Sequence, residues 1–194
     1  MYRRDPSELS WFQAAAVPSL ELLDALGVQA DAAVVDVGGG ASPLAGQLVK
    51  RGFTDVSVLD VAESALAEAR SLLGSDAGEV TWLPQDVRSW SPSRLYGLWH
   101  DRATFHFFVD DTDRSRYLAV LERALAPDGA AVIATFAPDA PDHCSGLPVV
   151  RYDAAGLAAL LAPSFELVHE RREEHRTPRG IIQPFTWVAL RRTP

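Results

Sequence analysis

Apolar runs alternate with amphipathic segments along most of the chain. Short apolar runs predict strands, and apolar residues spaced three or four positions apart predict helices. Regular alternation of the two is typical of a parallel β-sheet covered by helices on both faces. We expect strands at residues 33–37, 56–60, 80–83, 95–99, 130–135, 165–170 and 183–190. We expect helices near residues 18–27, 42–51, 62–73, 112–125 and 153–161.

Turn-forming residues and strand composition add detail to this pattern. The first strand, AVVDV, is nearly all apolar, as expected of an interior strand with both faces covered. Pro127 and Gly129 should stop a helix and allow a tight turn before the next strand. The polar stretch RREEHRTPRGII between the last two strands suits a long hairpin turn. The sequence therefore predicts an α/β fold with a doubly wound, mostly parallel seven-stranded sheet and an antiparallel C-terminal hairpin.

Composition and charge narrow the class of protein. A chain of 194 residues with 47% hydrophobic content fits one domain with a substantial core. The formal net charge of −8 argues against a nucleic-acid partner, because phosphate binding needs a concentrated basic surface. The sequence contains no apolar run of the ~20 residues that a membrane span needs and no secretory signal at its N-terminus. We expect a cytoplasmic protein without a membrane partner, either a monomer or a homodimer.

A glycine run lies directly between the first expected strand and the helix that follows it. Asp36 and Val37 lead into Gly38, Gly39 and Gly40. Glycines in this position let the backbone turn sharply and let a ligand lie against bare main chain. A strand-to-helix turn rich in glycine is also a packing device, and this alternative stays open.

Acidic residues follow the next two expected strands. Asp60 ends the second strand, where a carboxylate can accept hydrogen bonds from both hydroxyls of a ribose. Asp86 follows the third strand, where it can accept a hydrogen bond from an exocyclic amine such as that of adenine. Helix capping is the alternative role for each acid. Three strand ends at one sheet edge favour a nucleoside site.

These residues carry a family resemblance over about residues 30–135. The order V-V-D-V-G-G-G, L-D-V, Q-D-V and L-A-P-D-G resembles class I S-adenosylmethionine-dependent methyltransferases, which have a three-layer, Rossmann-like fold. In that family the glycine loop holds the methionine part of the cofactor, and the acids after strands two and three hold the ribose and the adenine. The resemblance implies S-adenosyl-L-methionine as cofactor. The cofactor-binding residues expected on this basis are Asp36, Gly38, Gly39, Gly40, Ser42, Asp60, Val61, Asp86, Val87, His100 and Trp11.

The nearest competitor is a nicotinamide-binding Rossmann domain. It also has an acid about 20 residues beyond its glycines. Counting G-x-G-x-x-G from Gly38 places Pro43 where the third glycine belongs. A pyrophosphate loop would therefore be imperfect, whereas S-adenosylmethionine has no phosphate to bind.

The fourth expected strand leads into the chain's densest group of functional side chains, WHDRATFHFF. Its W-x-D-R-A segment is similar to the W-D-R-G segment of thiopurine methyltransferase-like enzymes, and its D-R-A-T to the D-K-G-T of elongation-factor lysine methyltransferases. Ala103 replaces the glycine of both patterns. In the functional interpretation, Asp101 lies near the sulfonium of the cofactor and Arg102 supports the site. In the alternative, the two residues only hold the loop in place. His106 is the candidate general base, with simple packing as its alternative.

Two further groups are candidates for the acceptor side. Trp11, before the first helix, can form an aromatic lid over the sulfonium or simply pack that helix on the core. Cys144, the sole cysteine, follows His143 in an irregular stretch at 137–150, and together with His106 and His175 it offers nitrogen and sulfur ligands. Their spacing matches no recognised metal site, so we expect no metal.

The leading expectation is a single methyltransferase domain over residues 1–194 that acts on a small-molecule acceptor. Residues 1–29 would form a helical cap, residues 30–135 the cofactor-binding core, and residues 136–194 the acceptor-side loop and hairpin. A thiol or another soft nucleophile is the candidate acceptor, on the strength of the thiopurine-enzyme segment. A protein-lysine methyltransferase and a non-catalytic protein that binds an adenosyl ligand are the alternatives.

Overall fold

A computed structural model describes residues 13–193, in which one seven-stranded sheet has the order β3-β2-β1-β4-β5-β9-β8. The strands are β1 (Val34–Val37), β2 (Val56–Leu59), β3 (Val80–Leu83), β4 (Tyr96–Arg102), β5 (Leu125–Phe136), β8 (Phe165–Arg176) and β9 (Ile182–Arg192). The helices are α1 (Val17–Ala25), α2 (Leu44–Lys50), α3 (Glu63–Leu73), α4 (Asp111–Ala124) and α5 (Ala154–Leu161). Shorter elements are the 3-10 turns η2 (Gly74–Glu79) and η3 (Phe105–Phe107) and the two-residue strands β6 (His143–Cys144) and β7 (Leu147–Pro148).

The strand directions confirm the predicted fold class. Strands β1 to β5 run parallel, whereas β9 pairs antiparallel with both β5 and β8. Strand β1 lies between β2 and β4, so the chain winds outward on one side of β1 and then returns to the other side. This reversal of strand order opens a crevice at the carboxyl ends of the strands, where ligands of open α/β sheets bind.

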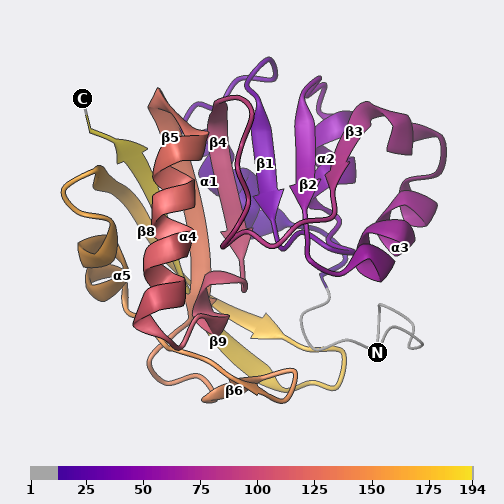
Figure 1. The fold of residues 1–194 in the computed structure, drawn as a ribbon. Coiled ribbons are helices and arrows are strands. Elements are labelled where there is room, and N and C mark those ends of the chain that lie inside the picture. The colour runs from indigo at the N-terminus through magenta and orange to yellow at the C-terminus, as the bar shows by residue number, and fades with distance from the viewer. Residues whose placement is uncertain (1–12, 194) are drawn as a thin grey trace.

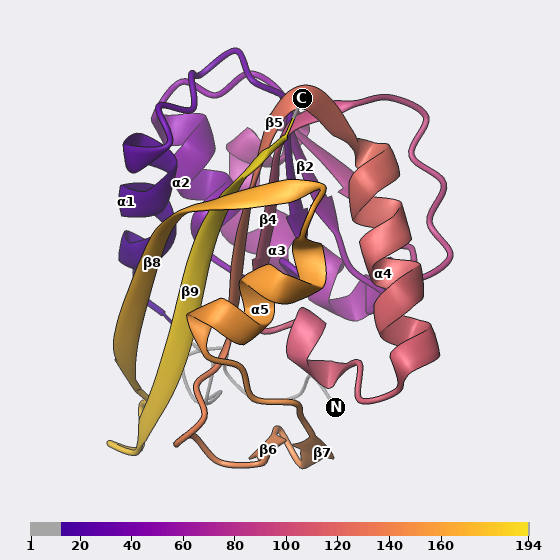
Figure 2. The same cartoon turned by 90° about the vertical axis from the view of Figure 1, so that its left-hand side faces the viewer.

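Helices cover both faces of the sheet (Figures 1 and 2). The core on one face includes Leu23 of α1, Leu48 of α2 and Leu66 of α3. The core on the other face includes Tyr117 of α4 and Leu157 of α5. The sheet is therefore the middle of three layers, as the nearly all-apolar sequence of β1 predicts.

The C-terminal hairpin is longer than the sequence pattern indicates. The polar stretch from Arg171 to Arg176 belongs to β8, and the turn between the strands is confined to residues 177–181. The prediction of a long turn there was wrong. Strand β8 is the edge of the sheet, and charged side chains are tolerated at an edge because one side of the strand faces solvent.

The start of β5 holds the tight turn expected around Pro127 and Gly129. Helix α4 ends at Ala124, and β5 pairs with β4 first through Leu125 and then again from Ala130. A Cβ on Gly129 would lie 2.9 Å from the carbonyl oxygen of Ala126, so this close turn requires glycine.

The parallel strands all end at the lower edge of the sheet in Figure 1, and this edge positions the site. The β6–β7 hairpin and the turn between β8 and β9 lie at the same end in both views (Figures 1 and 2). Within residues 13–193, no helix has both the length and the apolar character needed to cross a membrane.

Candidate functional site

A cavity of about 380 Å³ lies at the carboxyl ends of β1 to β4. Backbone hydrogen bonds continue the ladder just past the strands, from Gly38 N to Leu59 O at 2.7 Å and from Asp60 N to Leu83 O at 3.1 Å. These hydrogen bonds therefore keep the carboxyl ends of β1, β2 and β3 in register. The sequence-predicted residues that line the cavity are Asp36, Gly38, Gly39, Gly40, Ser42, Asp60, Val61, Asp86, Val87, His100 and Arg102. Trp11 lies outside the described residues.

The glycine loop passes so close to its neighbours that side chains would not fit. Gly38 has a φ of +67°, and a Cβ there would lie 1.7 Å from Oγ1 of Thr104. A Cβ on Gly39 would lie 2.5 Å from Oδ2 of Asp36. Packing therefore requires these glycines, and the same residues form a wall of the cavity. Ser42 accepts a hydrogen bond from the Leu44 amide at 3.2 Å, at the start of α2.

Asp36 is the acid at one end of a buried hydrogen-bonded chain. Its Oδ1 lies 2.7 Å from Nδ1 of His100, and Nε2 of His100 lies 2.9 Å from Oγ of Ser19 on α1. Oδ2 of Asp36 is buried and has no hydrogen-bond partner among residues 13–193. A buried carboxylate oxygen without a donor is costly, so this atom is suited to accept a hydrogen bond from a ligand.

Asp60 supplies a second, partly buried carboxylate to the same cavity. Its Oδ1 accepts a hydrogen bond from the Ala62 amide at 2.8 Å, just before α3 begins at Glu63. Burial raises the pKa of Asp60 above its ordinary value and the charge of Asp36 adds to this, whereas the amides of Ala62 and Gly40 oppose it. Two acids in one cavity favour a ligand that carries positive charge.

Asp86 lies at the end of β3 and is paired with Arg88, a residue that the sequence analysis did not select. The hydrogen bonds and charge of Arg88 lower the pKa of Asp86 below its ordinary value. Asp86 therefore lines the cavity as a paired carboxylate.

Asp101 holds the loop after β4 in place through hydrogen bonds. This fully buried carboxylate accepts hydrogen bonds from the amides of Thr104 at 2.9 Å and Phe105 at 3.1 Å and from the Tyr117 hydroxyl at 2.7 Å. Burial raises its pKa to about 6 although these hydrogen bonds lower it. Asp101 is not among the residues that line the cavity. Its contacts favour the alternative in which it pins the loop.

Two neighbours of Asp101 explain the shape of this loop. Ala103 has a φ of +69°, a left-handed conformation that glycine adopts without strain. Glycine would therefore fit this position of the loop. Thr104, which the sequence analysis did not single out, donates from Oγ1 to the carbonyl oxygen of Val37 at 3.2 Å. This bond joins the β4 loop to the glycine loop.

His106 lies beneath the cavity wall and is fully buried. Its Nδ1 accepts a hydrogen bond from the Phe136 amide at 3.3 Å, so the neutral ring carries its proton on Nε2. Burial and the nearby charge of Arg102 lower its pKa to about 3. The one lone pair that could take a proton is already engaged, and the ring does not line the cavity. These observations favour the packing alternative.

The far end of the cavity combines one cation with aromatic rings and the β6–β7 hairpin. The Arg102 guanidinium carbon lies 4.7 Å from the centre of the Phe185 ring, and burial lowers the pKa of Arg102. Phe107 and Phe108 also line the cavity, as do Cys144 and Ser145 of the hairpin. Burial raises the pKa of the Cys144 thiol.

The described part of the chain contains no group of three or more His, Cys, Asp or Glu side chains that could hold a metal ion. His106, Cys144 and His175 therefore do not form a metal-binding cluster.

Replacing Gly38 with alanine should destabilise the fold more than the same change at Gly27. Both glycines have a φ of +67°, so each variant carries similar backbone strain of about 1–2 kcal/mol. A Cβ on Gly27 has no neighbour within 4 Å, whereas one on Gly38 collides with Thr104. Overpacking should add about 1–3 kcal/mol to the loss in Gly38→Ala, measured as the free energy of unfolding in urea. Equal losses in the two variants would contradict the close contact.

Comparison with known proteins places residues 34–129 in a family described as methyltransferase domain. No curated protein matches the chain in sequence. Among solved structures, the 1,6-didemethyltoxoflavin-N1-methyltransferase of Burkholderia thailandensis, with its substrate and S-adenosylhomocysteine bound, is 22% identical. The alignment covers 92% of this chain and 78% of that one, with a TM-score of 0.73.

Two further structures have the same fold. The N-methyltransferase NodS of Bradyrhizobium japonicum WM9, in complex with S-adenosylhomocysteine, is 17% identical over 92% of this chain and 87% of its own, with a TM-score of 0.72. An S-adenosylmethionine-dependent methyltransferase of Mesorhizobium loti is 21% identical over 92% and 99%, with a TM-score of 0.70. At these identities the likeness concerns the fold. The methyltransferase domain matched at residues 34–129 and the S-adenosylhomocysteine bound in two of these structures support an S-adenosylmethionine-dependent methyltransferase.

Proposed function

We propose that the enzyme transfers the methyl group to a small-molecule acceptor, with the cofactor in the cavity at the ends of β1, β2 and β3. The observation that carries this proposal is the buried Oδ2 of Asp36, which lies beside Gly39 and has no hydrogen-bond partner in the part of the chain that the structure describes. An ammonium group is the natural donor for such an oxygen. The methionine part of the cofactor supplies one.

The remaining groups of the cavity suit the rest of the cofactor. Asp60 would accept hydrogen bonds from the ribose hydroxyls, and Val61 and Val87 would lie against the adenine. S-adenosylmethionine is a net cation because it carries a sulfonium, and the carboxylates of Asp36 and Asp60 would attract it. When bound, the cofactor supplies the activated methyl group. The protein's contribution is to hold that group in line with the acceptor.

The acceptor is proposed to be small because the cavity is concave and modest in volume, about 380 Å³. A protein substrate would need an open groove for its backbone. The solved relatives also include an enzyme described with a bound small substrate, 1,6-didemethyltoxoflavin. A thiol acceptor stays a prediction that rests on the short thiopurine-enzyme segment around Asp101.

Positioning of the two reactants and exclusion of water are proposed as the main sources of the rate enhancement. Holding two reactants in line can lower a barrier by roughly 7–11 kcal/mol. Asp101 and Thr104 hold the loop after β4 through hydrogen bonds, and this loop would form the wall beside the methyl group. Arg102, which lines the cavity, would be the cation at its acceptor end.

The proposal predicts label transfer into small molecules. The protein is incubated with methyl-labelled S-adenosylmethionine and either a protein-free metabolite extract or a dialysed protein fraction. Label should enter the metabolite fraction, and Asp60→Asn should reduce the rate at least tenfold through loss of ribose hydrogen bonds to a charged group. Label in the protein fraction alone would favour the protein-methyltransferase alternative. Label in neither fraction, despite cofactor binding, would favour the non-catalytic alternative.

Replacing His106 with asparagine should leave turnover nearly unchanged. Asparagine keeps a hydrogen-bond acceptor near the position of Nδ1 and cannot act as a base at neutral pH. With its pKa at about 3, His106 stays neutral from pH 6 to pH 8, so its titration should not shape the rate there. The initial rate of label incorporation should have the same pH profile in the wild type and in His106→Asn. A rate at least a hundredfold lower in a folded variant would restore the general-base assignment.

A further inference from the structure

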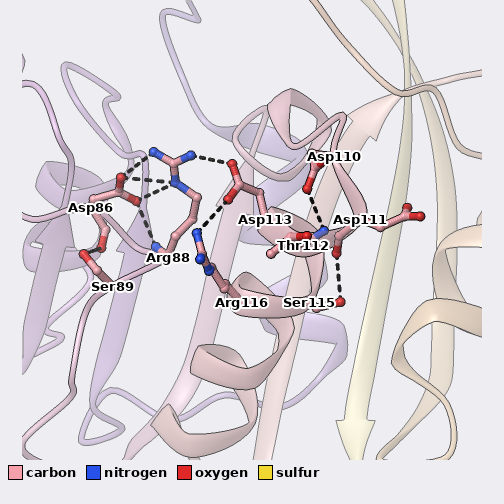
Figure 3. Close-up of polar contacts among 9 residues, drawn as sticks. All are labelled: Asp86, Arg88, Ser89, Asp110, Asp111, Thr112, Asp113, Ser115 and Arg116. Atoms are coloured by element: carbon pink, nitrogen blue, oxygen red, sulfur yellow. Dashed lines mark hydrogen bonds and ion pairs between the residues drawn. The ribbon is translucent and has the colours of Figure 1, made fainter.

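Arg88 follows Asp86 by two residues and holds its carboxylate in the loop after β3 (Figure 3). Nε of Arg88 lies 3.0 Å from Oδ1 and 3.1 Å from Oδ2, and Nη2 lies 2.6 Å from Oδ2. The main-chain amide of Arg88 also donates to Oδ1 at 2.9 Å. Both oxygens of Asp86 therefore accept hydrogen bonds from the loop itself.

The other side of the guanidinium is anchored on α4. Nη1 of Arg88 lies 2.5 Å from Oδ2 of Asp113, and Oδ1 of Asp113 lies 3.3 Å from Nη1 of Arg116 (Figure 3). The guanidinium carbon also lies 5.8 Å from the centre of the Phe108 ring. Withdrawing Arg88 from Asp86 would disturb its contacts with Asp113 and Phe108 as well, so the pairing should persist when a ligand enters.

This pairing bears directly on how a nucleobase is recognised. Asp86, Arg88 and Phe108 all line the cavity, at the end of β3 where the family resemblance places the adenine. The exocyclic amine of adenine is a donor, so its recognition needs an oxygen with a free lone pair. An ionised carboxylate has about four lone-pair directions. Three N–H groups of Arg88 already bond to Asp86, and the Nε–H is shared between its two oxygens, so most of these directions are taken.

We propose that Arg88 determines how this enzyme reads the base, because it takes up most of the hydrogen-bonding capacity of the Asp86 carboxylate and so weakens that acid as a partner for the adenine amine. Arg88 is then a positioning residue, and the base is held by apolar side chains such as Val61 and Val87 and by the main chain. The inference rests on the proposed function, since it takes an adenosyl ligand as its premise.

The test compares two ligands by calorimetry, S-adenosylhomocysteine and its deamino analogue, in which hydrogen replaces the exocyclic amine. The wild type should bind the two within about threefold. Arg88→Met releases the Asp86 carboxylate, so this variant should prefer the amine-bearing ligand by about tenfold or more, the value of one hydrogen bond to a charged group. Arg116→Met is the matched control, because Arg116 touches Asp113 and not Asp86. It should keep the wild-type ratio.

A second variant keeps the proposal testable if Arg88→Met does not fold. Asp86→Asn should leave the ratio of the two affinities at its wild-type value. The proposal is overturned if the wild type prefers the amine-bearing ligand tenfold or more and Asp86→Asn abolishes the preference. It is also overturned if folded Arg88→Met keeps the wild-type ratio. Failure of the wild type to bind S-adenosylhomocysteine would instead overturn the proposed function, and the inference with it.

Discussion

The buried hydrogen-bonded chain from Asp36 through His100 to Ser19 joins three elements of the fold at one point. Asp36 and His100 are register partners on β1 and β4, and Ser19 belongs to α1, which packs against them. These hydrogen bonds hold Oδ1 of Asp36 and leave Oδ2 facing the glycine loop. The site depends on this arrangement, because it holds a carboxylate in a buried position and leaves one of its oxygens without a donor among residues 13–193.

Parallel strand pairing then brings the other acidic residues to the same end of the sheet. Since β2 and β3 run parallel to β1, their carboxyl ends place Asp60 and Asp86 beside Asp36 at one sheet edge. This part of the site could be predicted from sequence, because it follows from strand periodicity and from the residue that comes next after each strand. The glycines could be predicted too, although their role in packing against Thr104 could not.

Side-chain pairings between distant segments were not accessible from the sequence. Arg88 and Asp113 are 25 positions apart, and Tyr117 and Asp101 are 16 apart, so no local pattern links them. The length of β8 was missed for a different reason: its charged residues resemble a turn, and only its position at the sheet edge makes them acceptable in a strand.

Burial separates the residues that line the cavity from those that support it. Asp101 and His106 have side chains of the right chemical type in the right loop, yet both lie beneath the wall, where desolvation shifts each pKa toward the neutral form. Sequence gives residue type and order, whereas the path of the loop decides exposure. Ala103 illustrates the point, because the left-handed backbone at this residue is not a conformation that an alanine in the sequence would indicate.

A crystal structure of the complex with S-adenosylhomocysteine tests the central claim most directly. The account predicts that the amino group of the ligand lies within hydrogen-bond distance of Oδ2 of Asp36, with the ribose hydroxyls on Asp60. A ligand bound away from the ends of β1, β2 and β3, with Oδ2 of Asp36 still lacking a donor, would contradict it.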